Sequence, residues 1–127
     1  PRAICIAYAN GPRFERWLAD LRARRDAALA AGDTEAATAL ERQAVAQQDR
    51  FHRQAFEGAD VDDILARVAD ALPAVCEAAG VDRLEKVNRD RDASVVTVDV
   101  TDRLVALFEP SEQGRRWIAD LADRPLD

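Results

Sequence analysis

The stretch AICIAYANGP, Ala3 to Pro12, decides which class of fold we expect for this chain. It begins with a short apolar, partly β-branched run and ends at the turn-forming residues Asn10-Gly11-Pro12. Short apolar runs bounded by such residues are typical of buried strands. The stretch therefore predicts a strand over 3–8, and Pro12 suits the first turn of a helix that follows it.

Two long helices are predicted after this strand. Apolar residues recur near helical spacing from Phe14 to Leu29, up to a break at Gly32-Asp33-Thr34, where Asp33 or Thr34 can cap a second helix. The second helix has four apolar residues and one glutamine at alternating three- and four-residue steps, the spacing of helices that pack along each other: Ala37, Leu40, Ala44, Gln47 and Phe51. Residues 12–56 should form an αα-hairpin, whose Ala-rich seam would gain from a partner chain.

The rest of the chain mixes both hydrophobic periods. A broad apolar stripe over 61–79 predicts a third helix, capped by Asp60 and kinked near 69–72 because of Pro73. The segment 81–87 and the alternating Val96, Val98 and Val100 predict two strands. A short helix should follow, capped by Asp99 or Thr101. The closing helix should have Ser111 as its cap and three apolar anchors: Trp117, Ile118 and Leu121.

These elements predict an α+β fold that is mostly helical. An αα-hairpin and a third helix would pack with a small three-stranded sheet, with short C-terminal helices beside them. We expect a single domain over 1–127, made of the hairpin 12–56 and a sheet-and-helix body formed by 1–9 and 60–127. Leu65, Val68 and Leu72 should pack on a sheet formed by 4–6, Leu84 and 96–98.

Composition narrows the classes of function. The chain has 127 residues, enough for one domain, and its net charge is −6. Acidic residues are concentrated in 57–127, so nucleic-acid binding through a broad basic face is disfavoured. No apolar run reaches the roughly 18 residues of a membrane span, and we expect no membrane insertion. Cys5 and Cys76 suit small core positions, a disulfide between them stays open, and no zinc-binding motif is present.

The segments ILARVADALPAVCEAAGVDRLEKV, 64–87, and SVVTVDVTDRLVAL, 94–107, resemble the periplasmic chaperone family of Skp, also called OmpH-like. In both, a helix that ends at Gly is followed by a strand, a polar turn and a D-V-T-D-x-L-V helix start. The segment HRQAF, 52–56, and the C-terminal tail look more like a family of uncharacterised bacterial proteins of comparable plan. The chaperone resemblance implies a homo-oligomer with protein clients in the periplasm or another exported setting. A cytoplasmic setting is the alternative.

A weak metal candidate lies in the polar turn. Asn88, Asp90, Asp92 and Asp99, together with Ser94, match the oxygen-bearing positions of a calcium loop. Ala93 stands where such a loop needs glycine, and Asp99 is shorter than the usual bidentate Glu. A solvated turn is therefore favoured, and no metal or cofactor is predicted.

The weak candidate for catalysis is His52, the only histidine. It could act as a general base if an acid such as Asp49 oriented it beside a pocket, whereas a hydrogen-bonded histidine at the base of the hairpin is the simpler interpretation. Phe51, His52, Gln54 and Phe56 form the candidate binding set. Our main hypothesis is a non-enzymatic protein that oligomerises through its sheet and hairpin and holds or scaffolds other proteins. The alternative is a small enzyme or ligand-binding domain that uses His52 with nearby acids.

Overall fold

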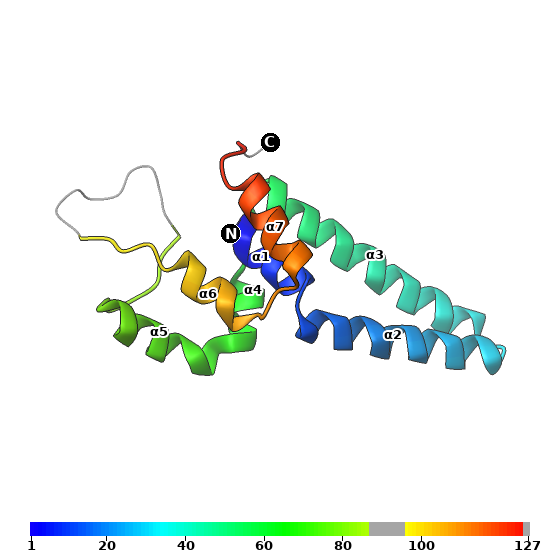
Figure 1. The fold of residues 1–127 in the computed structure, drawn as a ribbon. Helices are drawn as coiled ribbons and strands as arrows, with labels where there is room; N and C mark the ends of the chain where they lie inside the picture. The colour runs from blue at the N-terminus through cyan, green and yellow to red at the C-terminus, as the bar shows by residue number, and fades with distance from the viewer. Residues whose placement is uncertain (87–95, 126–127) are drawn as a thin grey trace.

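The computed structural model describes residues 1–86 and 96–125, and within these ranges every regular element is helical (Figure 1). The elements are α1 (Arg2–Ala9), α2 (Pro12–Ala30), α3 (Thr34–Phe56), α4 (Asp62–Leu65), the 3₁₀ helix η1 (Ala66–Ala71), α5 (Leu72–Ala79), α6 (Thr101–Leu107) and α7 (Glu112–Leu121). The α+β prediction is therefore wrong in its sheet, and the mostly helical part of it is confirmed.

The predicted strand over 3–8 lies inside α1 instead. The side chains from Ile4 to Tyr8 are all buried, so the helix is enclosed on every side. A short apolar run is expected in a strand that is buried on both faces, and equally in a helix that is buried on all sides. The hydrophobic period therefore does not distinguish these two structures. Ala3, Ala7 and Ala9 favour the helix, because alanine has the highest helix propensity.

The three-stranded sheet is absent from the part of the chain that the structure describes. Residues 81–86, most of one predicted strand, form an irregular segment after α5. Val96 and Val98, which should have faced the core from another strand, are 89% and 49% exposed. With 3–8 in a helix, these segments lack the central strand they would pair with, and an isolated pair of strands is marginal in water.

The αα-hairpin is confirmed, and it projects from the rest of the molecule (Figure 1). Asp33 caps α3 by accepting a hydrogen bond from the Ala36 N–H at 3.0 Å. Gly32, in the turn, has a φ of 74°, which glycine adopts without steric cost. The outer part of the seam is as thin as its composition predicts, and its buried residues are Leu21, Ala37 and Leu40.

The third predicted helix is divided into α4, η1 and α5. Pro73 stands in the first turn of α5, where its missing N–H costs no helical hydrogen bond. The backbone departs from helical geometry at Val68, with φ −120° and ψ 21°, and η1 covers the region where the kink was predicted. Asp60 acts near the start of α4, since its carboxylate accepts a hydrogen bond from the Asp62 N–H at 3.3 Å.

The core surrounds α1. Tyr8 lies at its centre, with its ring centroid within 5.9 Å of those of Phe14, Phe51 and Phe108. Val68 is buried in this core, but the sheet on which it was predicted to pack is absent from the described residues. It packs instead in a cluster with residues from α1, α3, α4 and α6, including Ile4, Ala55, Ile64 and Leu104. Leu65, Leu72 and Leu84 are partly buried against the same cluster. The core position predicted for 96–98 is wrong, because Val96 and Val98 are exposed.

The two C-terminal helices pack against α1. The Asp99 carboxylate accepts a hydrogen bond from the Thr101 N–H at 2.9 Å at the start of α6, and Ser111 caps α7 by accepting one from the Gly114 N–H at 3.1 Å. Ile118 packs against the core, as predicted for an anchor. Trp117 is exposed, so the prediction that it anchors α7 is wrong.

Arg2 links the beginning of the described chain to its end. Its guanidinium donates to the carbonyl oxygens of Ala55 at 2.7 Å, Leu121 at 2.6 Å, Arg124 at 2.7 Å and Pro125 at 3.1 Å. A cation near the last carbonyls of a helix is favoured by the helix dipole and satisfies acceptors that lack a helical partner. This one side chain therefore fastens the ends of α3 and α7 to α1.

None of the helices in the described ranges combines the length and the apolar content that crossing a membrane requires.

Candidate functional site

The four residues predicted as a binding set divide between two sides of α3. Phe51 contacts the aromatic core, with its ring centroid 4.9 Å from that of Phe14. Gln54 is buried, whereas His52 is exposed and Phe56 is half-buried. Residues three or four positions apart lie on the same side of a helix, so Phe51 and Gln54 share one side of α3 and His52 and Phe56 share another. The set therefore does not converge on one site.

Gln54 belongs to a polar cluster that joins α3 to α4. Its amide nitrogen donates to the backbone carbonyl of Asp60 at 3.0 Å and to the Asp63 carboxylate at 2.7 Å. Asp63 also forms an ion pair with Arg50 at 3.0 Å. Only 1% of Gln54 is exposed, and its amide oxygen has no partner among the described residues. The cluster fixes the loop between two helices, which is a structural role.

Cys5 lies close to this cluster. Its Sγ is 3.6 Å from the Phe51 carbonyl oxygen. Burial, with a smaller contribution from the charge on Asp63, raises the pKa of the Cys5 thiol to about 12. Because the thiolate is the nucleophilic form, this buried thiol is unreactive near neutral pH. Both cysteines are free, so the disulfide that the sequence left open does not form in this structure.

The candidate general base His52 has one acidic neighbour. Its Nε2 lies 3.6 Å from Glu57 Oε1, so the acid in contact is Glu57 and not the predicted Asp49. The His52 side chain is 62% exposed. Neither of the two grooves described below is lined by His52. Both side chains are exposed, so among the described residues this pair forms no enclosed position for a substrate.

Phe56 packs beside two polar side chains. The His52 ring centroid lies 5.2 Å from the Phe56 ring centroid, and the Arg2 guanidinium lies over the Phe56 ring at 5.8 Å. Because Arg2 also binds four backbone carbonyls, Phe56 supports the junction of α1, α3 and α7. The contacts of Phe56 therefore indicate a structural role.

The calcium-like pattern is described only in part. Asn88, Asp90 and Asp92 lie outside the described residues. The hydrogen bonds from Thr101 hold the pKa of the Asp99 carboxyl below its usual range, and they occupy Asp99 in starting α6. Within the described ranges, no group of three or more His, Cys, Asp or Glu side chains is arranged to bind a metal ion.

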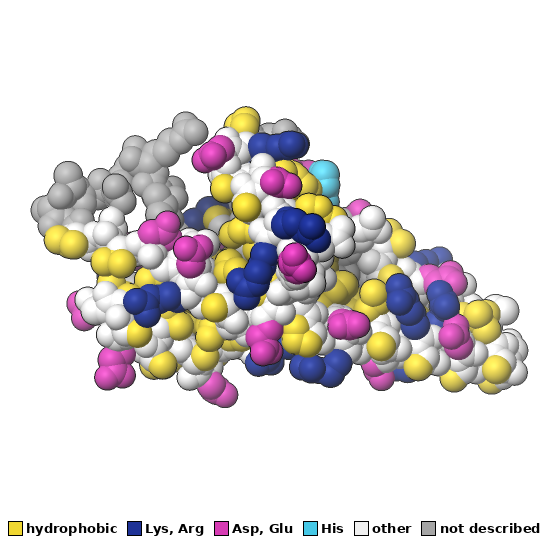
Figure 2. All heavy atoms as spheres, in the orientation of Figure 1, with side chains coloured by type: hydrophobic (Ala, Val, Ile, Leu, Met, Phe, Trp, Pro, Cys, Tyr) yellow, Lys and Arg dark blue, Asp and Glu magenta, His cyan; other side chains and the backbone are white. Residues whose placement is uncertain are grey.

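Two large apolar side chains are exposed on the hairpin. Leu29 on α2 is 51% exposed and Val45 on α3 is 57% exposed. Figure 2 shows hydrophobic side chains distributed along the hairpin between charged ones, so a partner would cover an interrupted apolar surface. Val45 is not among the predicted site residues, although its place one position after Ala44 of the seam indicates an exposed side chain.

Two grooves lie elsewhere in the described structure. The larger, of about 630 Å³, lies between α5 and residues 81–84 and is called the α5 groove here. The smaller, of about 220 Å³, lies where α1, α2 and the start of α7 meet, and its lining includes Asn10, Glu15 and Ser111. A strand over 81–87, as the sequence predicts, would not form a wall of this groove, so the α5 groove does not follow from the sequence pattern.

No family model, no curated protein and no solved structure matches this chain. Proposals about its function therefore rest on the geometry above and on the sequence-level resemblance.

Proposed function

We propose that this chain is a non-enzymatic helical-hairpin protein that self-associates through one side of its hairpin and holds or scaffolds other proteins. The observation that carries the proposal is the exposure of Leu29 and Val45 on a hairpin whose own seam is thin. Of the two surfaces that the sequence predicts for association, the sheet is not found among the described residues, so the proposal concerns the hairpin. An exported setting and protein clients, both implied by the chaperone resemblance, stay predictions.

Helix geometry supports the view that Leu29 and Val45 lie on the same side of the hairpin. Leu21 on α2 and Ala37 on α3 are buried where the two helices face each other. Ala28 follows Leu21 by seven residues and Ala44 follows Ala37 by seven, and both are half-buried, so they also lie between the two helices. In two antiparallel right-handed helices, the residues directly after the facing positions lie on one side of the plane through both axes. Leu29 and Val45 follow Ala28 and Ala44, and they define what we call the Leu29 side.

The size of this apolar surface predicts weak association. Fully burying a Leu or Val side chain stabilises by about 1.5–3 kcal/mol, and these two are already half covered. A symmetric pair of hairpins would cover four such side chains, while association costs at least about 4 kcal/mol of lost freedom. The four half-covered side chains together supply about 3–6 kcal/mol, so at most about 2 kcal/mol remains after this cost. We therefore expect a weak dimer that forms only at millimolar or higher protein concentration and dissociates on dilution.

Sedimentation equilibrium of a charged variant tests the proposal. Leu29→Glu combined with Val45→Glu should stay monomeric at concentrations where the wild-type mass rises, because the glutamates would be buried unpaired in the interface. The matched control is Ala27→Glu with Ala46→Glu. Both alanines are exposed, and each comes directly before a residue that faces the other helix, Ala28 or Gln47, so both lie on the opposite side of the hairpin. The control variant changes the net charge by the same amount. A stable wild-type monomer, or equal loss in both variants, would contradict the proposal.

The alternative function, a small enzyme or ligand-binding domain that uses His52, has less support from the geometry. His52 is exposed, and the larger of the two grooves, the one between α5 and residues 81–84, is lined by other residues. A His52→Ala variant separates the two proposals, since self-association through the Leu29 side should be unchanged by it. If the same variant abolished self-association, His52 would have to be assigned to the interface.

A further inference from the structure

The α5 groove is formed by the turn that ends α5. Gly80 has the left-handed conformation, with φ 69° and ψ 33°. The Val81 N–H donates to the Cys76 carbonyl at 3.0 Å, and the Gly80 N–H donates to the Glu77 carbonyl at 3.1 Å. This pair of bonds is the Schellman motif, which turns the chain back along the helix it ends. Residues 81–84 therefore form one wall of the groove and α5 forms the other.

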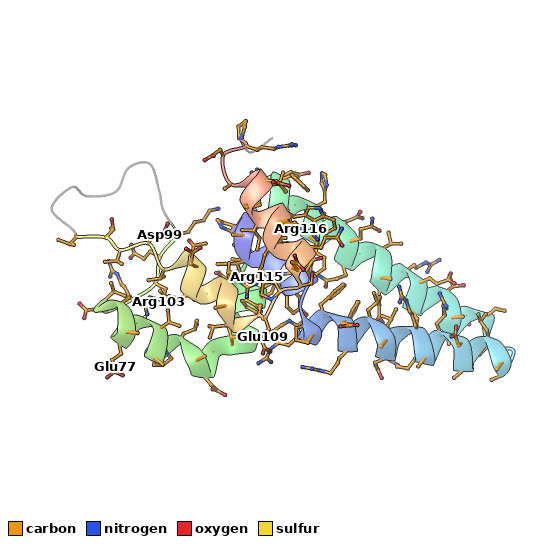
Figure 3. All side chains as sticks on the ribbon, viewed as in Figure 1. Glu77, Asp99, Arg103, Glu109, Arg115 and Arg116 are labelled. Carbon is orange, nitrogen blue, oxygen red and sulfur yellow. The ribbon has the colours of Figure 1, made fainter. Side chains whose placement is uncertain are left out.

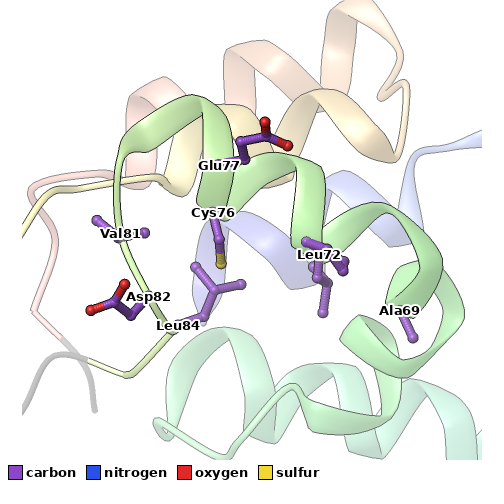
Figure 4. A pocket seen from close by; sticks show the side chains of 8 residues that line it. Ala69, Leu72, Cys76, Glu77, Val81, Asp82 and Leu84 are labelled. Carbon is purple, nitrogen blue, oxygen red and sulfur yellow. The ribbon is translucent and has the colours of Figure 1, made fainter.

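The far end of this wall is also fixed. Lys86 Nζ donates to the Gly58 carbonyl oxygen at 2.6 Å, which ties the segment to the loop between α3 and α4. Leu72 and Leu84 pack against the core from the two walls. In Figure 4 the Cys76 sulfur points into the space between α5 and Leu84. The groove is thus held open by the fold.

The lining of the groove combines apolar side chains with acids at its edge. Six of the eight lining residues are apolar or weakly polar: Ala69, Leu72, Pro73, Cys76, Val81 and Leu84. The other two, Glu77 and Asp82, are exposed. Neither carboxylate forms an ion pair with any residue that the structure describes. Glu77 points away from the body of the molecule (Figure 3).

The surrounding sequence has the same sign of charge. Residues 60–86 include seven acidic and three basic residues. Two of the basic ones already have partners, because Arg83 pairs with Glu85 at 2.7 Å and Lys86 binds the Gly58 carbonyl. The two charged residues that line the groove, Glu77 and Asp82, are both acidic, and together with the apolar walls they favour a ligand with an apolar stripe and flanking cations.

We propose that the α5 groove binds a cationic amphipathic helix of a partner protein. A volume of about 630 Å³ is enough for several apolar side chains, and apolar grooves of this kind accept the i, i+3, i+4 stripe of a helix. The Lys or Arg residues that flank the stripe would pair with Glu77 and Asp82. This inference rests on the proposed holding function and names the class of segment that is held.

A synthetic peptide of Leu and Lys, with Leu at helical spacing and a fluorescent label, is the probe. Fluorescence anisotropy should show binding to the wild type and little binding of a matched peptide in which Glu replaces Lys. Glu77→Lys combined with Asp82→Lys should weaken binding by at least about tenfold, because it replaces two attractions with two repulsions. Both residues are exposed, so the variant should fold.

The control for overall charge is Asp49→Lys combined with Asp120→Lys. These acids are exposed, lie on α3 and α7, and do not line the groove. The control should change peptide binding by less than about twofold, since its charges are screened from the groove by salt. Equal weakening by both variants would show attraction to an acidic protein in general and would overturn the inference.

Cys76 gives a second readout that does not depend on charge. Its thiol lines the groove and is half-buried, whereas Cys5 is enclosed in the core. A peptide in the groove should slow the alkylation of Cys76 by iodoacetamide, as followed by mass spectrometry. Peptide binding that leaves the Cys76 rate unchanged would place the peptide elsewhere and overturn the inference.

The same peptide assay on the Leu29→Glu, Val45→Glu variant separates this inference from the proposed function. Binding by a monomeric variant supports the groove whether or not the wild type associates. A wild type that self-associates but does not bind the peptide overturns the groove alone. If Glu77→Lys with Asp82→Lys abolished self-association, the occupant would be a second copy of this chain, which contradicts the partner proposed here.

Discussion

At the scale of single residues, Gly11 lies where the backbone of two distant segments comes close together. A Cβ at this position would lie 2.3 Å from the Phe108 carbonyl oxygen and 3.0 Å from the Ala7 carbonyl oxygen. Both neighbours are backbone atoms, so the junction of α1, α2 and the loop after α6 would have to move. Gly11→Ala should therefore lower the free energy of unfolding by about 1–3 kcal/mol in urea titrations.

Gly32→Ala is the comparison for this prediction. Nothing lies within 4 Å of a Cβ at Gly32, and its φ of 74° leaves only backbone strain as a cost. Gly11→Ala should be the more destabilising of the two. The reverse order would mean that the contact between Gly11 and Phe108 relaxes easily and does not fix the junction.

The buried Cys5 makes stability depend on pH in the alkaline range. Its pKa in the folded state is about 12, above the ordinary value of 9.0, so folding favours the neutral thiol. The contribution of the Cys5 thiol to the free energy of unfolding is fully present below about pH 9. It is lost as the pH rises toward 12, with a slope of up to about 1.4 kcal/mol per pH unit for this one group.

Cys5→Ala should reduce this alkaline slope in urea unfolding measured at several pH values. Some slope should remain, because burial also raises the pKa of Tyr8. An unchanged slope would mean that the Cys5 thiol is reached by water in the folded state.

At the scale of elements, the sequence predicts the parts whose signals are local. The hairpin follows from heptad-like steps, the Asp33 cap and the Gly32 turn, all within one stretch of chain. The predicted strands are wrong because strand pairing depends on distant segments: 3–8 forms α1, and no strand among the described residues pairs with the alternating valines at 96 and 98. Helical spacing alone places Phe51 and Gln54 on one side of α3 and His52 and Phe56 on another, so this division of the candidate binding set could have been predicted from the sequence.

The core around α1 should determine stability more than the hairpin does. Val68 is buried among α1, α4 and α6 residues, and Val68→Ala should cost about 1–3 kcal/mol because it removes buried methyl groups and leaves a void. Leu40 lies in the thin seam, outside the main cluster. Its truncation should cost less in a monomer, because the outer hairpin can open locally without unfolding the core.

Chemical denaturation at a concentration where the protein is monomeric measures both variants. A larger loss for Leu40→Ala than for Val68→Ala would make the hairpin the folding core. The account of a core centred on α1 would then be wrong.

At the scale of the whole molecule, a helical body closed around α1 carries a hairpin whose own seam buries few side chains. The body is closed around α1 and fastened by Arg2, whereas the hairpin has few buried side chains and exposes Leu29 and Val45. Because the hairpin buries fewer side chains than the body, we expect association to stabilise the hairpin and to leave the stability of the body unchanged. Local stability that depends on a partner rises with protein concentration by mass action.

Hydrogen exchange of the wild type at low and high protein concentration measures whether association stabilises the hairpin and leaves the core around α1 unchanged. Peptides from residues 21–45 should exchange more slowly at high concentration, because a second hairpin covers the Leu29 side. Peptides from α1 should exchange slowly at both concentrations, since the core opens only with global unfolding. Hairpin exchange that does not change with concentration, or α1 exchange as fast as that of the hairpin, would contradict the account.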